Sequence, residues 1–179
     1  MRVIAGKYRR LLLKAPKGHN TRPSLDQVKE AIFSIIGDKV FDAKCLDLFA
    51  GSGALGIEAL SRGASFVHFN DKSYESIKVI KENIAHCKIK EPYQITKMDY
   101  KRLLSTIDTK FDLVFLDPPY KEGVINEVIT TLEKRNLLNE KAVIVCETDL
   151  KPPILNVKDY QIKEYYYGRV CLTILKRIE

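Results

Sequence analysis

From residue 45 onward, short apolar runs alternate with segments whose apolar residues recur at helical spacing. Five of the runs predict β-strands, at Cys45–Phe49, Phe66–Asn70, Tyr93–Lys97, Leu113–Leu116 and Ala142–Cys146. Helical patterns lie between them, at Ala54–Arg62, Tyr74–Cys87, Tyr100–Ser105 and Val124–Lys134. Such alternation with short connections is typical of an α/β fold in which helices cover both faces of a parallel sheet.

The chain before residue 45 predicts an appendage and a leading helix. Arg2–Ile4 and Leu11–Leu13 are apolar or mixed pieces that predict a short hairpin or an extended arm. A capping box that begins at Ser24 precedes apolar residues at helical spacing, so we expect a helix there. We therefore divide the chain into a basic N-terminal arm or hairpin, residues 1–22, and a main domain, residues 23–179.

Two more strands are predicted near the end of the chain. Lys163–Tyr167 and Val170–Leu175 flank the two-residue turn Gly168-Arg169. This arrangement is typical of a β-hairpin, and we expect it to close one edge of the sheet.

The positive charge is concentrated at the N-terminus. The chain has 30 Lys and Arg against 23 Asp and Glu, a net charge of +7. Residues 1–22 contain no acid and seven bases: Arg2, Lys7, Arg9, Arg10, Lys14, Lys17 and Arg22. The arm thus carries the whole excess, which favours a polyanionic partner that docks at one place. A solvated segment that serves only solubility is the alternative.

The remaining composition is that of one ordinary globular domain, with 45% hydrophobic and 30% charged residues among 179. No apolar stretch approaches the roughly 18 residues that a membrane helix needs, so we expect no membrane partner. The cysteines are far apart and form no C-x-x-C pair: Cys45, Cys87, Cys146 and Cys171. We therefore expect reduced thiols, no metal site and a cytoplasmic protein.

The most specific chemical signal is Asp117-Pro118-Pro119-Tyr120, which directly follows the predicted strand Leu113–Leu116. Proline has no backbone N–H to donate, so the chain must leave the sheet there. The turn presents a carboxylate, backbone carbonyls and an aromatic ring at the edge where open α/β sheets bind ligands. These groups can hold an exocyclic amine and cover a flat base. An ordinary strand that ends at prolines is the simpler alternative.

A glycine-rich loop follows Asp47, and its Gly51-x-Gly53-x-x-Gly56 pattern has the spacing of nucleotide-binding loops. Asp71 ends the next predicted strand, where an acid can hold ribose hydroxyls. Asp99, after the third strand, could accept a hydrogen bond from an adenine amine, although it is also a good helix N-cap. Asp47 would repel a pyrophosphate. The loop therefore favours S-adenosyl-L-methionine, which has no phosphate and carries ammonium and sulfonium charges, over a dinucleotide.

Together these residues resemble the Rossmann-fold S-adenosylmethionine-dependent methyltransferases, and specifically the bacterial 16S ribosomal RNA guanine-N2 methyltransferases. The resemblance extends over nearly the whole chain. Its motifs are Arg2-Val3-Ile4-Ala5-Gly6-Lys7-Tyr8-Arg9, Asn20-Thr21-Arg22-Pro23-Ser24, the loop from Asp47 to Gly63, residues 111–120 with their [DN]-P-P-[YF] element, and Tyr167-Gly168.

The resemblance implies a doubly wound, Rossmann-like sheet of seven strands with one antiparallel strand. It implies methyl transfer from S-adenosylmethionine to the N2 amine of a guanine in 16S ribosomal RNA. We expect the RNA to be part of an assembling small-subunit particle, and a monomer is the simplest expectation for the protein. The candidate cofactor-binding residues are Asp47, Phe49, Ala50, Gly51, Ser52, Gly53, Asp71, Lys72, Asp99 and Tyr100. The candidate catalytic residues are Asp117, Pro118, Pro119 and Tyr120. The candidate RNA-binding residues are Arg2, Lys7, Arg9, Arg10 and Arg22.

Two alternatives remain open at this point. The same tetrapeptide could hold the N6 amine of adenine, which would make the protein an adenine methyltransferase that acts on RNA or DNA. A non-catalytic RNA-binding module on the same fold is the other alternative. Such modules usually lose the cofactor loop or the amine-binding acid, whereas this chain retains Gly51, Gly53, Asp71 and Asp117.

Overall fold

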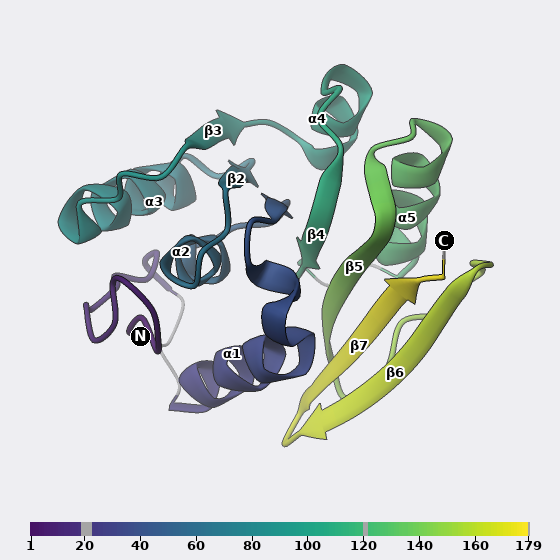
Figure 1. The fold of residues 1–179 in the computed structure, drawn as a ribbon, viewed down its shortest axis with the longest axis horizontal. Helices are drawn as coiled ribbons and strands as arrows, with labels where there is room; N and C mark the ends of the chain where they lie inside the picture. Colours follow the sequence, from purple (N-terminus) through teal and green to yellow (C-terminus); the bar gives the residue numbers. More distant parts are fainter. Residues whose placement is uncertain (19–22, 120–121, 179) are drawn as a thin grey trace.

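The computed structural model describes residues 1–18, 23–119 and 122–178, and it contains one seven-stranded sheet with the order β3-β2-β1-β4-β5-β7-β6 (Figure 1). The strands are β1 (Lys44–Asp47), β2 (Phe66–Asp71), β3 (Tyr93–Lys97), β4 (Phe111–Leu116), β5 (Leu138–Asp149), β6 (Tyr160–Tyr167) and β7 (Val170–Arg177). Neighbouring strands from β3 to β5 pair in parallel, and β7 is antiparallel to both of its neighbours. The predicted doubly wound sheet with one antiparallel strand is confirmed.

Helices cover both faces of this sheet, so the fold has three layers (Figure 1). The helices are α1 (Pro23–Ile36), the 3-10 turn η1 (Gly37–Val40), α2 (Ala54–Ser61), α3 (Tyr74–Cys87), α4 (Tyr100–Thr106) and α5 (Val124–Lys134). One core lies between the sheet and α1, α2 and α3, and a second lies between the sheet and α4 and α5. Alternate residues of β4 enter alternate cores, with Leu113 and Phe115 in the first and Val114 and Leu116 in the second.

The boundaries of the first helix, β1 and β5 are among those that differ from the predictions. The first helix begins at Pro23, one residue before the predicted cap Ser24, because proline suits the first helical turn, where its missing N–H costs nothing. The strand β1 ends at Asp47 and not at Phe49. The strand β5 is longer than predicted at both ends. At its start, a register shift against β4 near Lys141, whose φ is 58°, lets pairing continue back to Leu138. At its end, residues 147–149 pair with β7.

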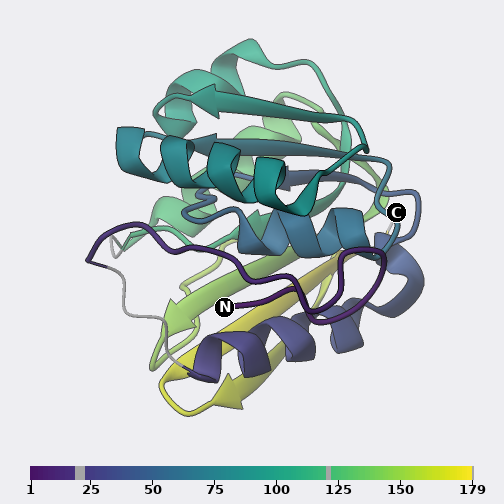
Figure 2. The same cartoon turned by 90° about the vertical axis from the view of Figure 1, so that its left-hand side faces the viewer.

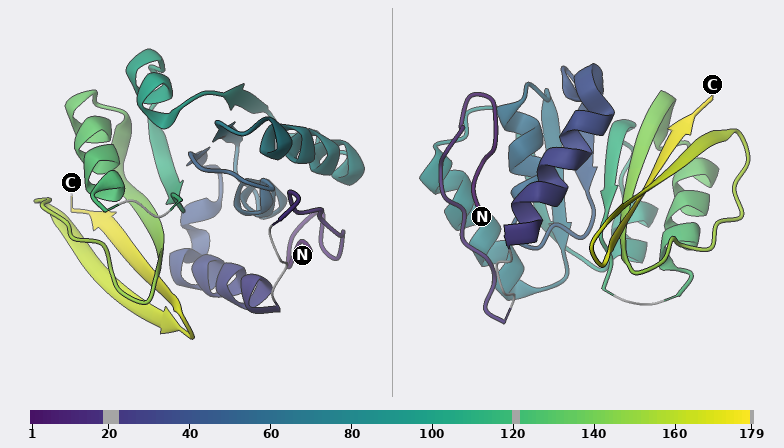
Figure 3. Two further views of the ribbon diagram at one scale, coloured as in Figure 1. Left: turned by 180° about the vertical axis from the view of Figure 1, so that it is seen from behind. Right: turned by 90° about the horizontal axis from the view of Figure 1, so that it is seen from below.

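The C-terminal hairpin is confirmed with the predicted turn, and β6 forms the outer edge of the sheet. Figure 3 shows it at the end of the molecule opposite the N-terminal segment, by which we mean residues 1–18. Among the described residues, no helix combines the length and the apolar character needed to cross a lipid bilayer. All four cysteines are buried and unpaired.

The N-terminal segment folds as a small hairpin-like loop. Arg2 and Leu12 form an antiparallel bridge, and the Val3 N–H donates to the Leu11 carbonyl at 2.9 Å. The segment also enters the first core through three side chains that are at most 6% exposed: Val3, Tyr8 and Leu13. It is therefore packed as part of the globular body, because burial of such side chains is the main source of stabilisation in a domain.

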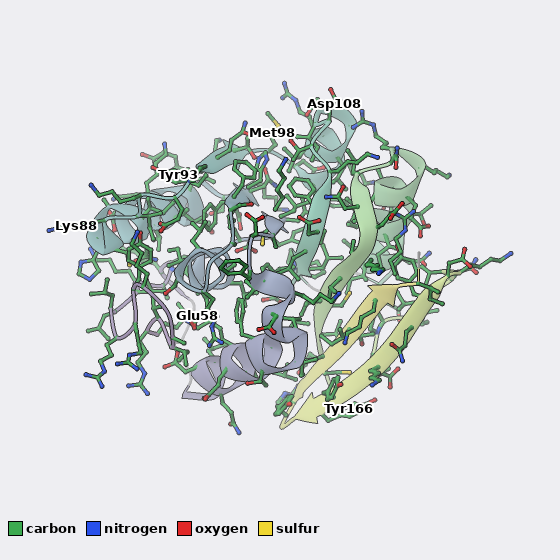
Figure 4. All side chains as sticks on the ribbon, viewed as in Figure 1. Glu58, Lys88, Tyr93, Met98, Asp108 and Tyr166 are labelled. Atoms are coloured by element: carbon green, nitrogen blue, oxygen red, sulfur yellow. The ribbon has the colours of Figure 1, made fainter. Side chains whose placement is uncertain are left out.

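The segment is anchored to α2 by backbone and side-chain hydrogen bonds. The Ile4 N–H donates to Glu58 at 2.9 Å, and the Tyr8 N–H donates to the Ser61 Oγ at 2.9 Å. Ser61 in turn donates to the Ala5 carbonyl at 2.6 Å. Figure 2 shows the segment running between α2 and α1, and Figure 4 shows Glu58 between the segment and α1.

Gly56 lies where α2 packs most closely on β2. A Cβ at this position would lie 2.3 Å from Phe69 Cε1 and 2.8 Å from Val67 Cγ1, both in the buried strand. We expect Gly56→Ala to lower the free energy of unfolding by about 1–3 kcal/mol, the usual cost of overpacking a core. Urea denaturation measures this change, with Ser34→Ala at an exposed position of α1 as the control. Equal denaturation midpoints for the two variants would contradict the prediction.

Candidate active site

Four carboxylates gather at the carboxyl edge of the sheet. Asp47 and Asp71 are the last residues of β1 and β2, and Asp117 directly follows β4. Glu147 lies beside Asp117, because Leu116 pairs with Cys146 in the parallel register of β4 and β5. Each of the four stands two residues beyond a member of the first core: Cys45, Phe69, Phe115 and Val145. Since side chains alternate along a strand, all four share the face covered by α1, α2 and α3.

The glycine-rich loop is shaped by two of these carboxylates. Asp47 Oδ2 accepts the Gly56 N–H at 3.1 Å, and Asp71 Oδ2 accepts the Gly51 N–H at 3.0 Å. Gly51 and Gly53 have φ values of 57° and 80°, a region that glycine enters without a steric penalty. A Cβ at Gly51 would meet no atom of the described residues within 4 Å. The loop therefore leaves open space beside its backbone, where a ligand can approach.

Asp71 retains acceptor capacity. Its Oδ1 accepts the Ser73 N–H at 2.9 Å, and its Oδ2 is bonded to the loop. Each carboxylate oxygen has two lone-pair directions, so each keeps one for a hydroxyl donor. Asp71 is partly exposed and neighbouring Lys72 is fully on the surface, so both predicted cofactor residues are accessible.

Asp99 caps α4, which was one of the two roles considered for it. Its Oδ1 accepts the Lys101 N–H at 2.9 Å, and the residue is exposed at the surface. Next to it, the ring centroids of Phe49 and Tyr100 lie 5.4 Å apart, with an angle of 55° between the ring planes. The Tyr100 hydroxyl donates to Glu127 at 3.2 Å. These three predicted cofactor residues are therefore brought together between the ends of β1 and β3.

Sequence reasoning missed Asn70, which joins three strand ends. Its side-chain amide donates to the Leu48 carbonyl at 3.2 Å and to the Met98 carbonyl at 3.0 Å. Its Oδ1 accepts from the Thr96 hydroxyl at 2.7 Å. Asn70 is 1% exposed, and a fully buried amide in an apolar strand needs such partners. A polar residue inside the predicted strand 66–70 was the available signal.

Glu147 was the second residue missed, because β5 was predicted to end at Cys146. Burial raises the pKa of Glu147, and the negative charge of Asp117 raises it further. Asp117 keeps exposed surface, yet the protein around its carboxylate removes enough water to raise the pKa of Asp117 as well. Like charges this close disfavour double ionisation, so the two carboxyls are expected to hold a proton between them more readily than isolated acids do.

Asp47 is the most deeply buried of the four acids, at 3% exposure. Burial raises its pKa to about 7, the charges of Asp117 and Asp71 add to this rise, and the hydrogen bond from Gly56 opposes it. The edge thus holds more negative charge than it can solvate. A cationic ligand relieves that excess, whereas a pyrophosphate aggravates it.

The turn after β4 is described only as far as Pro119. Pro118 is partly exposed and Pro119 is exposed, so both lie at the surface of the same edge as Asp117. Tyr120, the predicted aromatic cover for a base, falls outside the described residues.

Among the described residues, the candidate RNA-binding bases divide into two groups. Arg2 pairs with Asp26 at 3.6 Å and Lys7 pairs with Glu91 at 3.0 Å, both within the protein. Arg9 and Arg10 are exposed and form no ion pair with a described residue. Arg22 lies outside the described residues. Arg9 and Arg10 are therefore the bases most available to a polyanion.

The sheet order and the glycine-rich loop that joins β1 to α2 define the class of Rossmann-like methyltransferases. A family model described as Conserved hypothetical protein 95 matches residues 1–176. The chain is 41% identical over 152 residues to "Putative rRNA methyltransferase YlbH" of Bacillus subtilis (strain 168), and the match covers 83% of each sequence.

Two further likenesses agree. The chain is 33% identical over 151 residues to "Ribosomal RNA small subunit methyltransferase D" of Escherichia coli (strain K12), which covers 84% of this chain and 76% of that protein. The solved structure of "Putative methyltransferase yhhF from Escherichia coli" has a TM-score of 0.86 at 31% identity, and the match covers 99% of this chain and 97% of that one. The chain belongs to the Conserved hypothetical protein 95 family, that of ribosomal RNA small subunit methyltransferase D, as its motifs predicted.

Asp47→Asn tests the excess charge at this edge, because the amide still offers an oxygen to the Gly56 N–H. The folded-state pKa of Asp47, about 7, lies above the ordinary value of 3.8. Between these pH values the folded protein binds the extra proton, so wild-type stability falls as the pH rises.

We therefore expect the variant to gain stability over the wild type by about 1–3 kcal/mol between pH 4 and pH 7, with no further gain above pH 7. Urea denaturation of both proteins without ligand at pH 4, 5.5, 7 and 8.5 measures this difference. A difference that stays constant over the whole range would contradict the raised pKa of Asp47.

Proposed function

We propose that this protein transfers a methyl group from S-adenosylmethionine to the exocyclic N2 amine of a guanine in 16S ribosomal RNA. One observation carries the proposal: the glycine-rich loop and the Asp117 turn lie on neighbouring strands and open at the same edge. Asp47 pairs with Phe115, so Asp117 stands two residues beyond the strand position opposite Asp47. The names of the relatives support an RNA substrate, and the relative named for the small subunit supports 16S ribosomal RNA.

The residues at the edge fit the proposed methyl donor. Asp71 would accept hydrogen bonds from the ribose hydroxyls through its remaining lone pairs. The open backbone from Ala50 to Gly53 would lie against the donor, with the charge of Asp47 near its ammonium and sulfonium groups. Phe49, Tyr100 and Asp99 would border the adenine, and exposed Lys72 would lie at the rim. When bound, S-adenosylmethionine supplies an electrophilic methyl group on a positively charged sulfur.

Asp117 has the main role toward the amine. Its carboxylate and the Pro118 carbonyl would accept the two N–H bonds of the guanine N2 amine and orient the nitrogen toward the methyl group. Positive charge grows on this nitrogen as its new bond forms, and a fixed carboxylate beside it stabilises that charge. Alignment of two bound reactants can contribute about 7–11 kcal/mol to lowering the barrier.

Pro119 keeps the turn out of the sheet, and Tyr120 is proposed to stack on the base. Glu147 is proposed to keep a proton of its own, so that Asp117 remains ionised and able to accept. The N-terminal segment would contact RNA phosphates through Arg9 and Arg10, with Arg2, Lys7 and Arg22 as further candidates. We place the reaction in the cytoplasm, with a monomer acting on an assembling small-subunit particle.

Methylation of adenine N6 is the second candidate, because the same acceptors fit that amine. Digestion of the RNA product to nucleosides, followed by mass analysis, separates N2-methylguanosine from N6-methyladenosine. A non-catalytic module predicts no transfer of labelled methyl from S-adenosylmethionine to ribosomal RNA. The retained acids of the edge and the open loop favour the enzyme.

Asp117→Ala removes the proposed amine acceptor and leaves the cofactor loop in place. We expect methyl transfer to fall by about 10²–10³-fold, as when a group that stabilises transition-state charge is lost. S-adenosylmethionine affinity should change little. Single-turnover transfer to RNA and calorimetric titration with the cofactor measure the two effects.

Asp117→Asn is the matched variant, because it keeps a carbonyl acceptor in the same place but cannot titrate. Wild-type methyl transfer should decline as the pH falls through the raised pKa of Asp117. The reason is that a protonated carboxyl can no longer accept hydrogen bonds freely with both of its oxygens. The Asn variant should retain partial activity and lack this acid decline. Wild-type rates for Asp117→Ala would refute the assigned role.

Substitutions that remove charge test whether the N-terminal segment contacts RNA phosphates. Removal of residues 1–18 is unsuitable, because it would also remove the core side chains Val3, Tyr8 and Leu13. Each phosphate contact contributes roughly 0.7–0.9 to the slope of log K against log salt concentration. We expect the double variant Arg9→Gln, Arg10→Gln to lower this slope by roughly 1.5.

Lys7→Gln is the matched control, because Lys7 already pairs with Glu91 and should contribute less to RNA binding. Filter-binding or fluorescence titrations with in vitro transcribed 16S ribosomal RNA, at several salt concentrations, give the slopes. A double variant with the wild-type slope would exclude these two arginines as phosphate contacts.

A further inference from the structure

We propose that Asn83 couples the N-terminal segment to the cofactor loop, so that RNA bound to the segment tightens the binding of the cofactor. The inference rests on the proposed function, since it names the RNA and S-adenosylmethionine as the two coupled ligands. It assigns to Asn83 a positioning role, not a contact with either ligand.

Asn83 lies on α3 and is 1% exposed. Its Oδ1 accepts the Lys14 N–H at 2.8 Å, and its Nδ2 donates to the Lys14 carbonyl at 3.0 Å. The same Nδ2 donates to the Ser52 carbonyl at 2.9 Å. A side-chain amide has two N–H donors, so both are used, one on the segment and one on the loop. A single buried group thus fixes two separate pieces of backbone.

The loop end of this link belongs to the candidate cofactor site. Ser52 directly follows Gly51, the residue beside which the loop leaves open space for a ligand. The helix that carries Asn83 also supports the loop, because a Cβ at Gly53 would lie 3.3 Å from Ile80 Cγ1 on α3. Met1 Sδ lies 4.0 Å from the Ser52 Oγ, so both strands of the segment reach this part of the loop.

The other end of the link is Lys14, one of the bases of the N-terminal segment. Lys14 directs its ammonium to Glu82 at 3.4 Å, next to Asn83 in sequence, and its side chain is exposed. The segment has a second attachment at Ser61, which is on the last turn of α2 and thus at the end of that helix away from the loop. Of these two attachments, the one at Asn83 involves the loop backbone directly.

Coupling follows from what RNA would do to the segment. Phosphates bound to Arg9 and Arg10 would hold the segment in its docked position and so reduce the motion of Lys14. The Asn83 amide then holds the Ser52 carbonyl in one orientation more of the time, and a cofactor that needs this orientation loses less conformational entropy on binding. Linkage is reciprocal, so the cofactor must tighten RNA binding by the same factor.

The test compares the affinity for S-adenosylhomocysteine, the unreactive product, with and without saturating unmethylated 16S ribosomal RNA. We expect wild-type protein to bind this ligand about 5–10-fold more tightly when RNA is present, within the usual range of coupling between sites. Asn83→Ala should reduce the ratio to about one. Asn83→Asp, which keeps the acceptor for the Lys14 N–H but loses both donors, should do the same and serves if the Ala variant does not fold.

Ser61→Ala is the matched control, because it removes a buried anchor of the segment without touching the loop. It should weaken RNA binding while the wild-type affinity ratio is retained. A merely structural role for Asn83 predicts equal losses in both variants and an unchanged ratio. Wild-type ratios near or below one, or a full ratio in both Asn83 variants, would overturn the coupling.

Failure of the coupling and failure of the proposed function give different results. Wild-type protein that binds the ligand and methylates RNA, but with an affinity ratio of one, disproves the coupling alone. Wild-type protein that neither binds S-adenosylhomocysteine nor transfers a methyl group to RNA disproves the proposed function, and the coupling with it.

Discussion

The candidate site depends on two strand-end carboxylates that accept backbone N–H groups of one loop. Asp47 bonds to Gly56 and Asp71 bonds to Gly51, at 3.1 and 3.0 Å. Loops of this glycine spacing often direct such donors at a phosphate. Here the donors are occupied by acids, so the loop is electrostatically matched to a cation. The same bonds hold the loop against the sheet and thereby set the space that is left open beside Gly51.

The gathering of several acids at this edge is unfavourable, because the surrounding protein solvates their negative charges poorly. The raised pKa of Asp47, of Asp117 and of Glu147 shows that the edge carries more acid than its surroundings stabilise. An arrangement of this kind is common where function requires it, because a ligand of opposite charge relieves the repulsion when it binds. In the proposed reaction the negative charge of this edge acts on two groups, the sulfonium of the methyl donor and the amine that gains positive charge.

The N-terminal segment links the two proposed ligands in one structure. Its bases face outward, while Val3, Tyr8 and Leu13 join the core that also supports the loop. A segment attached only by surface charges could move freely without consequence for the cofactor. This one shares a buried amide with the loop, so a change in its docking has a direct physical route to Ser52.

The sequence by itself determined the order of strands and helices, the loop, the Asp117 turn and the family, because periodicity and short motifs are local properties. It placed Asp71 and Asp117 at strand ends, which a parallel sheet brings to one edge, whereas Asp47 was predicted inside the strand 45–49 and only the structure ends β1 there. Only the tertiary structure decided the length of β5, and with it the place of Glu147, since pairing with β7 extends the strand beyond Cys146 through polar residues. Asn70 and Asn83 likewise became visible only in three dimensions, because a buried amide is identified by partners distant in sequence. The basic arm was predicted from charge, but its apolar anchorage was decided by packing against α2 and α3.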